Sequence, residues 1–361
     1  MKKKALLSVV IPVFNVKDYL PKTLDCILAQ SYSDWELILV DDGSTDGSLE
    51  IEKSYSLRDD RVKVYQRDIQ PKGAPCCRNI GQSLAKGDYL IYLDSDDIIA
   101  PYCFQQRVDF IEANDCDFAV FPMMGFYDHL FDADGMIFGY KPEGDDVAAL
   151  LRRTLPFVVV SNIYNRKKLL ENGVTWDMNL KSYQDSDYNL QVIRAGLSYK
   201  VSNLLPDYFY RLSAINSICK KLYTVSNCQS QIGFLQKQTA IYGTNKDYHR
   251  ALLICAAQIF QNILASEDRK KMVQDFVEIN LFKNHGLLRI FLKQIVSLSG
   301  NSKSVGWLTL LQLIFTPFFF LQFKLCFRKC DKRNRVMYNT LAGIYNNCVT
   351  VNQKEQIVAK I

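Results

Sequence analysis

Short apolar runs rich in β-branched residues alternate with helical segments through the first 120 residues, and this alternation limits the possible folds more than any other feature. The predicted strands are 8–15, 35–40, 62–65, 89–93 and 117–121, and the predicted helices are 18–30, 76–85 and 101–113. The strands are apolar on both faces, as buried parallel strands are. Strand, turn and helix at this period predict an α/β fold with a mostly parallel sheet flanked by helices. Ligands of such sheets bind beyond the carboxyl ends of the strands.

Acidic turns follow two of the predicted strands at that edge. The fourth strand ends in Asp94, Asp96 and Asp97, three carboxylates within four positions. Like charges this close repel each other, and a bound Mg²⁺ or Mn²⁺ with phosphate oxygens as further ligands would explain the cluster. The alternative is an exposed turn that caps the next helix. The second strand ends in the turn 41–48, which also suits a helix cap.

Composition narrows the classes of function. The chain has 361 residues, enough for two domains, and 48% of them are hydrophobic, enough for a substantial core. Its 44 basic and 38 acidic residues give a formal net charge of +6, too small an excess to indicate nucleic-acid binding. No G-x-G-x-x-G pattern follows the first predicted strand, which counts against a dinucleotide site. A nucleotidyltransferase would also need a glycine-rich phosphate loop there.

The eleven cysteines and the N-terminus favour a cytoplasmic protein. Neither Cys76 with Cys77 nor the pair within residues 326–330 has His or Cys neighbours at zinc-binding spacing, so we expect reduced thiols. The basic residues 2–4 and the apolar run after them imitate a secretory signal. Because Pro12 interrupts the run and no small-residue cleavage site follows, we expect a first strand instead.

Five motifs in the N-terminal half occur in the order and spacing of one known family. They are Val-Ile-Pro-Val-Phe-Asn at 10–15, Val-Asp-Asp-Gly-Ser-Thr-Asp-Gly at 40–47, Arg-Asn-Ile-Gly at 78–81, Gly-Asp-Tyr at 87–89 and Leu-Asp-Ser-Asp-Asp at 93–97. Together they resemble the family 2 glycosyltransferases of bacterial surface-polysaccharide synthesis, which have the Rossmann-like GT-A fold. The resemblance covers about residues 5–220 and implies a nucleotide-sugar-binding and catalytic domain over residues 1–220.

The resemblance implies roles for the residues at the strand ends. Asp96 would hold a divalent metal, Mn²⁺ or Mg²⁺, with Asp94 supporting it at the ribose or through water. Asp42 would accept a hydrogen bond from the imide of a uracil-like base. The implied donor-binding residues are Pro12, Phe14, Asn15, Asp42, Arg78, Asp94, Ser95 and Arg211. The alternative for Arg78 is a structural ion pair with an acidic turn, and the alternative for Arg211 is a surface role.

Beyond residue 150 the match is looser. Asn162 stands where the family often has a lysine, and Gln184 replaces the first carboxylate of a Glu-Asp pair on the acceptor side. Asp185 keeps the second carboxylate, and the resemblance makes it the candidate base for the acceptor hydroxyl. The alternative is a solvated carboxylate at the start of a helix expected over 187–195. Asp187 is expected to point to another side of that helix and to take no part in the chemistry.

From residue 221 to 361 helical patterns replace strands, which predicts a helical C-terminal region. Residues 304–323 carry no charge and would reach about 30 Å as a helix, but Pro317 and a polar stripe favour a helix lying in the membrane plane. Residues 324–335 add six basic residues against one acidic residue, which suits anionic lipid headgroups. We predict that 304–335 attaches peripherally to the inner face of the membrane; a buried helix or a homodimer contact is the alternative.

Together these observations predict an inverting, metal-dependent glycosyltransferase in the cytoplasm, at the inner membrane surface. Its donor would be a nucleotide-sugar, a UDP-sugar, and its acceptor a hydroxyl of a glycan or of a lipid-linked oligosaccharide. No nucleic-acid partner is expected. The alternative is a catalytically inactive nucleotide-sugar-binding scaffold subunit with the same fold, for which Gln184 is the sequence hint.

Overall fold

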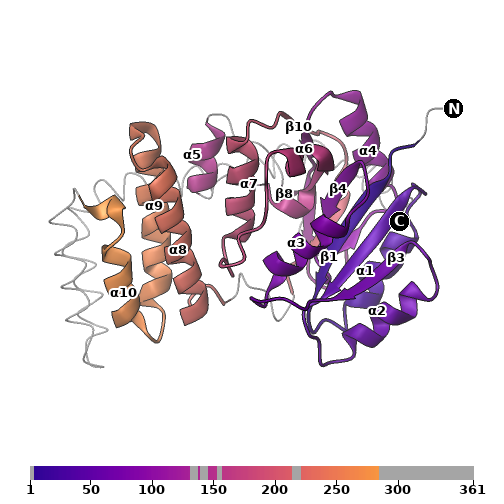
Figure 1. Ribbon diagram of the computed structural model, residues 1–361, viewed down its shortest axis with the longest axis horizontal. Coiled ribbons are helices and arrows are strands. Elements are labelled where there is room, and N and C mark those ends of the chain that lie inside the picture. Colours follow the sequence, from indigo (N-terminus) through magenta and orange to yellow (C-terminus); the bar gives the residue numbers. More distant parts are fainter. Residues whose placement is uncertain (1–3, 131–136, 139–144, 153–156, 214–220, 284–361) are drawn as a thin grey trace.

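A seven-stranded sheet with the order β10-β6-β9-β4-β1-β2-β3 is the centre of the N-terminal part of the chain. The computed structural model describes residues 4–130, 137–138, 145–152, 157–213 and 221–283 (Figure 1). The strands are β1 (Leu7–Val13), β2 (Trp35–Asp41), β3 (Val62–Gln66), β4 (Tyr89–Tyr92), β6 (Phe118–Val120), β9 (Asn162–Asn165) and β10 (Tyr199–Val201). The α/β fold and the five predicted strands are confirmed.

Helices cover both faces of this sheet. They are α1 (Leu20–Leu28), α2 (Ser48–Ser56), α3 (Ala74–Leu84), α4 (Cys103–Ala113), α6 (Arg166–Glu171) and α7 (Gln184–Arg194), with a 3₁₀ turn η1 (Val159–Ser161). The short helix α5 (Asp146–Leu151) packs on α7. Alternate side chains of β1 enter different cores. Val10 packs in the cluster that includes α3 and α7, whereas Val9 and Ile11 pack in the cluster that includes α1, α2 and α4.

Strand β9 departs from the predicted pattern. It runs antiparallel to both neighbours, with Tyr89 opposite Asn165 and Phe118 opposite Tyr164. The sequence indicated no strand at this position, because four residues are too few for a clear periodic signal. The insertion of β9 separates β4 from β6 in the sheet.

A second sheet, with the order β5-β11-β7-β8, follows the acidic turn at the end of β4. Its strands are β5 (Ile98–Ile99), β11 (Tyr208–Arg211), β7 (Met123–Phe126) and β8 (Ile137–Phe138). β11 pairs antiparallel with β5 and parallel with β7. Because β5 begins directly after Asp97, this sheet places one end of the acidic turn.

The chain ends its described part in helices, as predicted. These are α8 (Val225–Tyr242), α9 (Lys246–Leu264), α10 (Arg269–Val277) and a 3₁₀ turn η3 (Asn280–Phe282). Their apolar side chains belong to the same continuous cluster as Val10 of the sheet. Among the described residues, no helix has both the length and the apolar character needed to cross a membrane. The segment 304–335, predicted to attach to the membrane, lies outside the described residues.

Candidate functional site

The loops after β1 and β2 hold each other at the carboxyl edge of the sheet. Asn15 has a left-handed backbone with φ of 51°, and its Oδ1 accepts a hydrogen bond from Thr45 N at 2.8 Å. Asn15 N donates to Ser44 Oγ at 3.1 Å. The Asp41 carboxylate turns back on its own loop and accepts from Gly43 N at 2.9 Å and from Ser44 N at 3.1 Å. This rim is therefore held by main-chain N–H groups that donate to side-chain oxygens, both within the second loop and between the two loops.

Asp42, the predicted contact of the base, already has a partner. It is 4% exposed and forms an ion pair with the Nε of Arg67, a residue that directly follows β3 and that the sequence analysis did not single out. Phe14 is 43% exposed, and Lys72 Nζ lies 3.5 Å from the centroid of its ring. Pro12 is buried within β1, opposite a residue of β2. A base that bonds to Asp42 would therefore meet Arg67 as well.

The turn after β4 is held by its last carboxylate. Asp97 is 2% exposed, and it accepts hydrogen bonds from Tyr208 Oη at 2.5 Å and from Arg211 N at 2.7 Å, both in β11. On the other side, Thr23 Oγ1 of α1 donates to the main-chain oxygens of Ser95 and Asp97. Ser95 is buried. Asp97 therefore anchors the turn, and this leaves Asp94 and Asp96 as the two carboxylates available for a ligand.

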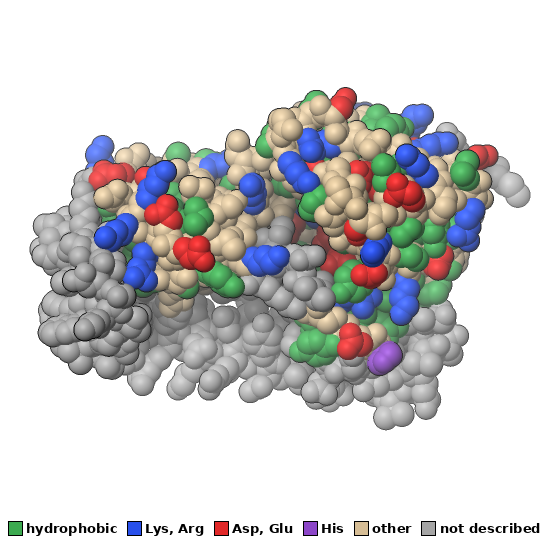
Figure 2. Space-filling model, turned by 90° about the horizontal axis from the view of Figure 1, so that it is seen from below, with side chains coloured by type: hydrophobic (Ala, Val, Ile, Leu, Met, Phe, Trp, Pro, Cys, Tyr) green, Lys and Arg blue, Asp and Glu red, His purple; other side chains and the backbone are tan. Residues whose placement is uncertain are grey.

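Asp94 and Asp96 suit a divalent cation by their chemistry. Burial, and then the charge of Asp94, raise the pKa of Asp96 to about 6. A carboxylate whose ionisation is opposed in both ways is stabilised strongly by a cation. Among the described residues no group of three or more His, Cys, Asp or Glu is placed to hold a metal. Figure 2 shows acidic side chains at the bottom of a hollow in one face of the molecule.

Arg211 lies against this turn. Its Nε donates to the main-chain oxygen of Asp96 at 2.8 Å, and its guanidinium lies between the rings of Tyr19 and Phe126, 4.9 and 4.5 Å from their centroids. The side chain is 7% exposed. A surface role, the alternative for Arg211, is therefore wrong, whereas contact with a diphosphate stays a prediction.

Arg78 connects the end of β4 with the start of α7. It lies in the first half of α3, and α3 packs so closely on β1 that a Cβ on Gly81 would lie 2.3 Å from Val10 Cγ1. Arg78 Nη2 donates to Asp94 Oδ1 at 2.7 Å, and Arg78 Nη1 donates to Gln184 Oε1 at 3.0 Å. Two acidic regions that are far apart in sequence therefore meet at one guanidinium.

Electrostatics extend this link to Asp185. Arg78 is buried, which opposes its charge, but the charges of Asp94 and then Asp185 raise the pKa of the Arg78 guanidinium above its ordinary value. The ion pair with an acidic turn, one of the two alternatives for Arg78, is thus present. Its donor-binding role stays a prediction; each terminal nitrogen makes one of the two bonds described above.

Helix α7 starts at Gln184 rather than at residue 187, so Asp185 lies in its first turn. The segment before it is fixed by Asn79 of α3, which exchanges two hydrogen bonds of 2.8 Å with the main chain of Trp176. The Trp176 ring stacks on Tyr188 of α7 with centroids 4.5 Å apart, and the Arg78 guanidinium lies 4.4 Å from the same ring. Asp185 therefore lies at the start of a helix that packs on aromatic side chains.

Two polar residues of this region, Asn162 and Asp187, are buried in the structure. Asn162, at the position of the family lysine, is fully buried in β9, where its Nδ2 donates to Tyr164 Oη at 2.7 Å. Asp187, expected to take no part, is 1% exposed and accepts from Lys237 Nζ of α8 at 2.9 Å. Sequence reasoning could not find this pair, since 50 residues separate its members.

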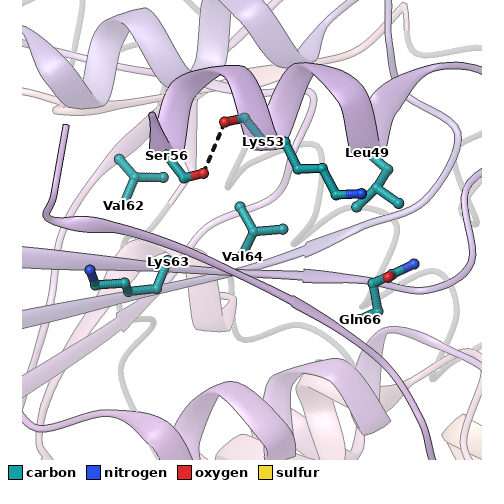
Figure 3. Close-up of a pocket in the computed structure, with 7 residues that line it drawn as sticks. All are labelled: Leu49, Lys53, Ser56, Val62, Lys63, Val64 and Gln66. Carbon is teal, nitrogen blue, oxygen red and sulfur yellow. Dashed lines mark hydrogen bonds between the residues drawn. The ribbon is translucent and has the colours of Figure 1, made fainter. Parts of the chain in front are cut away.

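A groove elsewhere on the chain lies between α2 and the edge strand β3 (Figure 3). It is lined by Leu49, Lys53, Ser56, Val62, Lys63, Val64 and Gln66. It contains lysines but no carboxylate, and it opens at the outer edge of the sheet rather than at the ends of β1 and β4. The chemistry of the strand ends therefore makes them the better candidate site.

Residues 8–174 match the family described as Glycosyl transferase family 2. The chain is 37% identical over 135 residues to Glycosyltransferase GlyG of Streptococcus pneumoniae serotype 4, a match that covers 37% of this chain and 43% of that protein. It is 29% identical over 206 residues to the Poly(ribitol-phosphate) beta-glucosyltransferase of Bacillus spizizenii, covering 56% of this chain and 31% of that protein. The chain thus spans less than half the length of either relative.

The fold has solved counterparts. The crystal structure of S. aureus TarS 1-349 superposes with a TM-score of 0.52 at 17% identity, covering 81% of this chain and 90% of that one. The same protein in complex with UDP superposes with a TM-score of 0.51 and the same coverage. This likeness shows the GT-A fold.

Proposed function

Because residues 8–174 belong to glycosyl transferase family 2, we propose that the chain transfers a sugar from a nucleotide-sugar, a UDP-sugar, to a hydroxyl of a glycan or of a lipid-linked oligosaccharide. The reaction inverts the configuration at the anomeric carbon and contributes to the synthesis of a bacterial surface polysaccharide. It takes place in the cytoplasm, at the inner face of the membrane.

The contact pattern of Arg78 is the observation that carries this proposal. One buried guanidinium holds Asp94 of the donor-side turn at 2.7 Å and Gln184, the neighbour of Asp185, at 3.0 Å. Displacement at an anomeric carbon needs a leaving-group site and a base on opposite sides of one sugar. A fixed bridge between the two acidic regions suits this arrangement.

On the donor side, the rim of β1 and β2 would receive the nucleotide. The partly exposed Phe14 ring offers an apolar surface to a base, and the Asp42–Arg67 pair offers an acceptor beside a donor. The edge of a uracil has the complementary pattern of one N–H between two carbonyls. Asp96 and Asp94 would hold the metal, which, when bound, neutralises charge on the diphosphate.

On the acceptor side, Asp185 takes the proton from the acceptor hydroxyl as its oxygen attacks the anomeric carbon. The bond from that carbon to the phosphate oxygen breaks, and its electron pair leaves with the nucleoside diphosphate. Arg78 and Arg211 keep two positive charges next to the β4 turn, where negative charge accumulates during this step. Arg211 would then contact the diphosphate.

Release of nucleoside diphosphate tests the proposal. A panel of UDP- and GDP-sugars with Mg²⁺ or Mn²⁺ is offered to the wild type, to Asp96→Ala and to Asp185→Asn, with Glu171→Gln as a control for an exposed acid on α6. We expect turnover of one donor class by the wild type and the control, loss of metal-dependent turnover in Asp96→Ala, and retained donor binding without transfer in Asp185→Asn.

The result also separates the scaffold alternative, for which the Gln184 amide is the structural hint. A scaffold binds a donor in calorimetry but releases no nucleoside diphosphate with any acceptor. If neither binding nor turnover occurs with a folded wild type, the glycosyltransferase proposal is wrong for this chain.

A further inference from the structure

The loop that leads into Asp185 is closed at both ends by one lysine of α8. Lys237 Nζ lies 2.8 Å from Asp177 Oδ2 at the start of this loop and 2.9 Å from Asp187 Oδ2 in the first turn of α7, just after the loop ends. Gln238, the next residue of α8, donates to Asp187 Oδ1 at 2.8 Å. Both oxygens of the buried Asp187 carboxylate are thus bonded to α8.

The middle of the same loop is held by a serine of α8. Ser230 Oγ accepts hydrogen bonds from Lys181 N at 2.9 Å and from Ser182 N at 3.0 Å, and it donates to Ser182 O at 3.0 Å. Ser182 Oγ in turn donates to Asn227 O. One hydroxyl therefore uses its donor and both of its acceptor positions on two consecutive residues of the loop.

A strained residue lies between this hold and Asp185. Tyr183 has φ of 63° and ψ of 13°, a left-handed conformation that costs a tyrosine roughly 1–2 kcal/mol. Its ring packs edge-on against Phe234 of α8, with centroids 5.4 Å apart. Strained residues of this kind persist only where their surroundings fix them. Here α8 holds the residue before Tyr183 and packs on its ring.

The residues of α8 that contact the loop share one face of the helix. They are Asn227, Ser230, Phe234, Lys237 and Gln238, at spacings of three and four. Figure 1 shows α8 between α7 and the outer helix α10. Because hydrogen bonds are directional, the contacts of this face are satisfied together only when α8 is in register with the loop.

We propose that α8, which lies beyond the family-matching residues 8–174, sets the position of Asp185, and that Lys237 and Ser230 are positioning residues for transfer. This inference rests on the proposed function, in which Asp185 is the base. The helical C-terminal region would then be part of the catalytic machinery and not only an appendage of it.

Paired measurements on full-length variants test the inference. The variants are Lys237→Met, Lys237→Arg and Ser230→Ala, and Gln236→Ala at an exposed position of the same helix is the control. In hydrogen exchange, we expect the amides of 181–187 to exchange at least tenfold faster in Lys237→Met and Ser230→Ala. They should exchange at the wild-type rate in the control and near it in Lys237→Arg.

Transfer should become slower in the same variants in which hydrogen exchange becomes faster. We expect the transfer rate to drop roughly 10- to 100-fold in Lys237→Met and Ser230→Ala, since a displacement of about 1 Å can cost that much. The dissociation constant for UDP should stay within about twofold of the wild type, and Lys237→Arg should recover most of the rate. A general loss of stability would instead weaken UDP binding and transfer together.

Three outcomes would overturn the inference. The first is unchanged hydrogen exchange over 181–187 in both Lys237→Met and Ser230→Ala. The second is faster exchange in these variants with a wild-type transfer rate, and the third is an equal loss of UDP affinity and of transfer. Failure of the proposed function looks different. In that case the wild type releases no nucleoside diphosphate from any donor, and the exchange data alone decide whether α8 holds the loop.

Discussion

Two acidic loops face the candidate site, and they are held in opposite ways. The turn 41–48 bonds mainly to itself and to the loop after β1; Asp41 accepts from residues two and three positions later. The loop 177–187 depends on partners about 50 residues away in α8 and about 100 residues away in α3. The first loop is held by bonds within itself and by the loop after β1, about 30 residues away, whereas the second depends on two helices that lie farther away in the sequence. Donor and acceptor sides should therefore respond differently to mutation.

The largest expected effect separates the two loops by function. Asp185→Asn should lower transfer by about 10²- to 10⁴-fold, because a positioned base contributes that much, and should leave UDP affinity nearly unchanged. Asp42→Asn should instead weaken UDP binding. Steady-state kinetics with UDP titration measures both. Loss of UDP affinity in Asp185→Asn, or a normal rate there, would contradict the division into donor and acceptor sides.

A smaller effect, on the free energy of unfolding, tests the contacts between α8 and residues 177–187. Lys237→Met leaves the buried Asp187 carboxylate without its ion pair and should cost about 3 kcal/mol, the lower end for a buried pair because Lys237 is partly exposed. Adding Asp187→Asn should recover part of this loss. Urea unfolding of the single and double variants measures it. Additive losses would mean that the pair is not coupled.

The helix that follows turn 41–48 contains a buried carboxyl group that makes the stability of the fold depend on pH. Glu52 of α2 is fully buried, and its carboxyl oxygens have no hydrogen-bond partner among the described residues. Burial, and then the charge of Asp41, raise the pKa of Glu52 from 4.5 to about 8. The folded chain therefore keeps a proton that the unfolded chain loses, so wild-type stability falls as pH rises through this window.

Glu52→Gln removes that ionisation and should flatten the pH profile. Relative to the wild type, the variant should gain up to about 2 kcal/mol between pH 6 and pH 8.5. Unfolding midpoints at the two pH values measure the gain, and Glu50→Gln, an exposed acid on the same helix, is the matched control. An equal pH response in wild type and Glu52→Gln would refute the buried proton.

The smallest expected effect concerns the hydrogen bonds of Asp46, within turn 41–48 and to the loop after β1. Asp46 Oδ1 accepts from the backbone N and the Oγ of Ser48 at 3.0 and 2.6 Å, and Asp46 Oδ2 accepts from Lys17 N. Burial by itself raises the pKa of Asp46, but these hydrogen bonds together lower that pKa below its ordinary value. Asp46→Ala should cost about 1 kcal/mol at neutral pH. Because the folded pKa of Asp46 lies below the 3.8 of an unperturbed Asp, the cost should shrink only as pH falls below 3.8, where the unfolded chain takes up a proton before the folded chain does. Melting curves at pH 7 and at a series of pH values below 3.8 test this.

The strand ends could be predicted because their signals are local. Apolar runs that end in Asp42 and Asp94 indicated both the parallel sheet and the edge that carries the acidic turns. The helix cap expected of turn 41–48 differs in the structure: the N-cap of α2 is Gly47, which has no side-chain cap bond, and Asp46 accepts from Ser48 N from the position before it. Arg67 had no such signal: it is a single basic residue after a short strand, and only the folded loop brings it to Asp42.

The sequence alone determined the α/β class, the parallel core and the placement of Asp42, Asp94 and Asp96 at one edge, because strand periodicity and turn chemistry act over a few residues. The tertiary structure decided the antiparallel insertion of β9, the Arg78 bridge and the hold of α8 on the loop of Asp185. These contacts join residues up to 106 positions apart. Such pairings depend on how helices and sheet pack, and no local pattern in the chain encodes them.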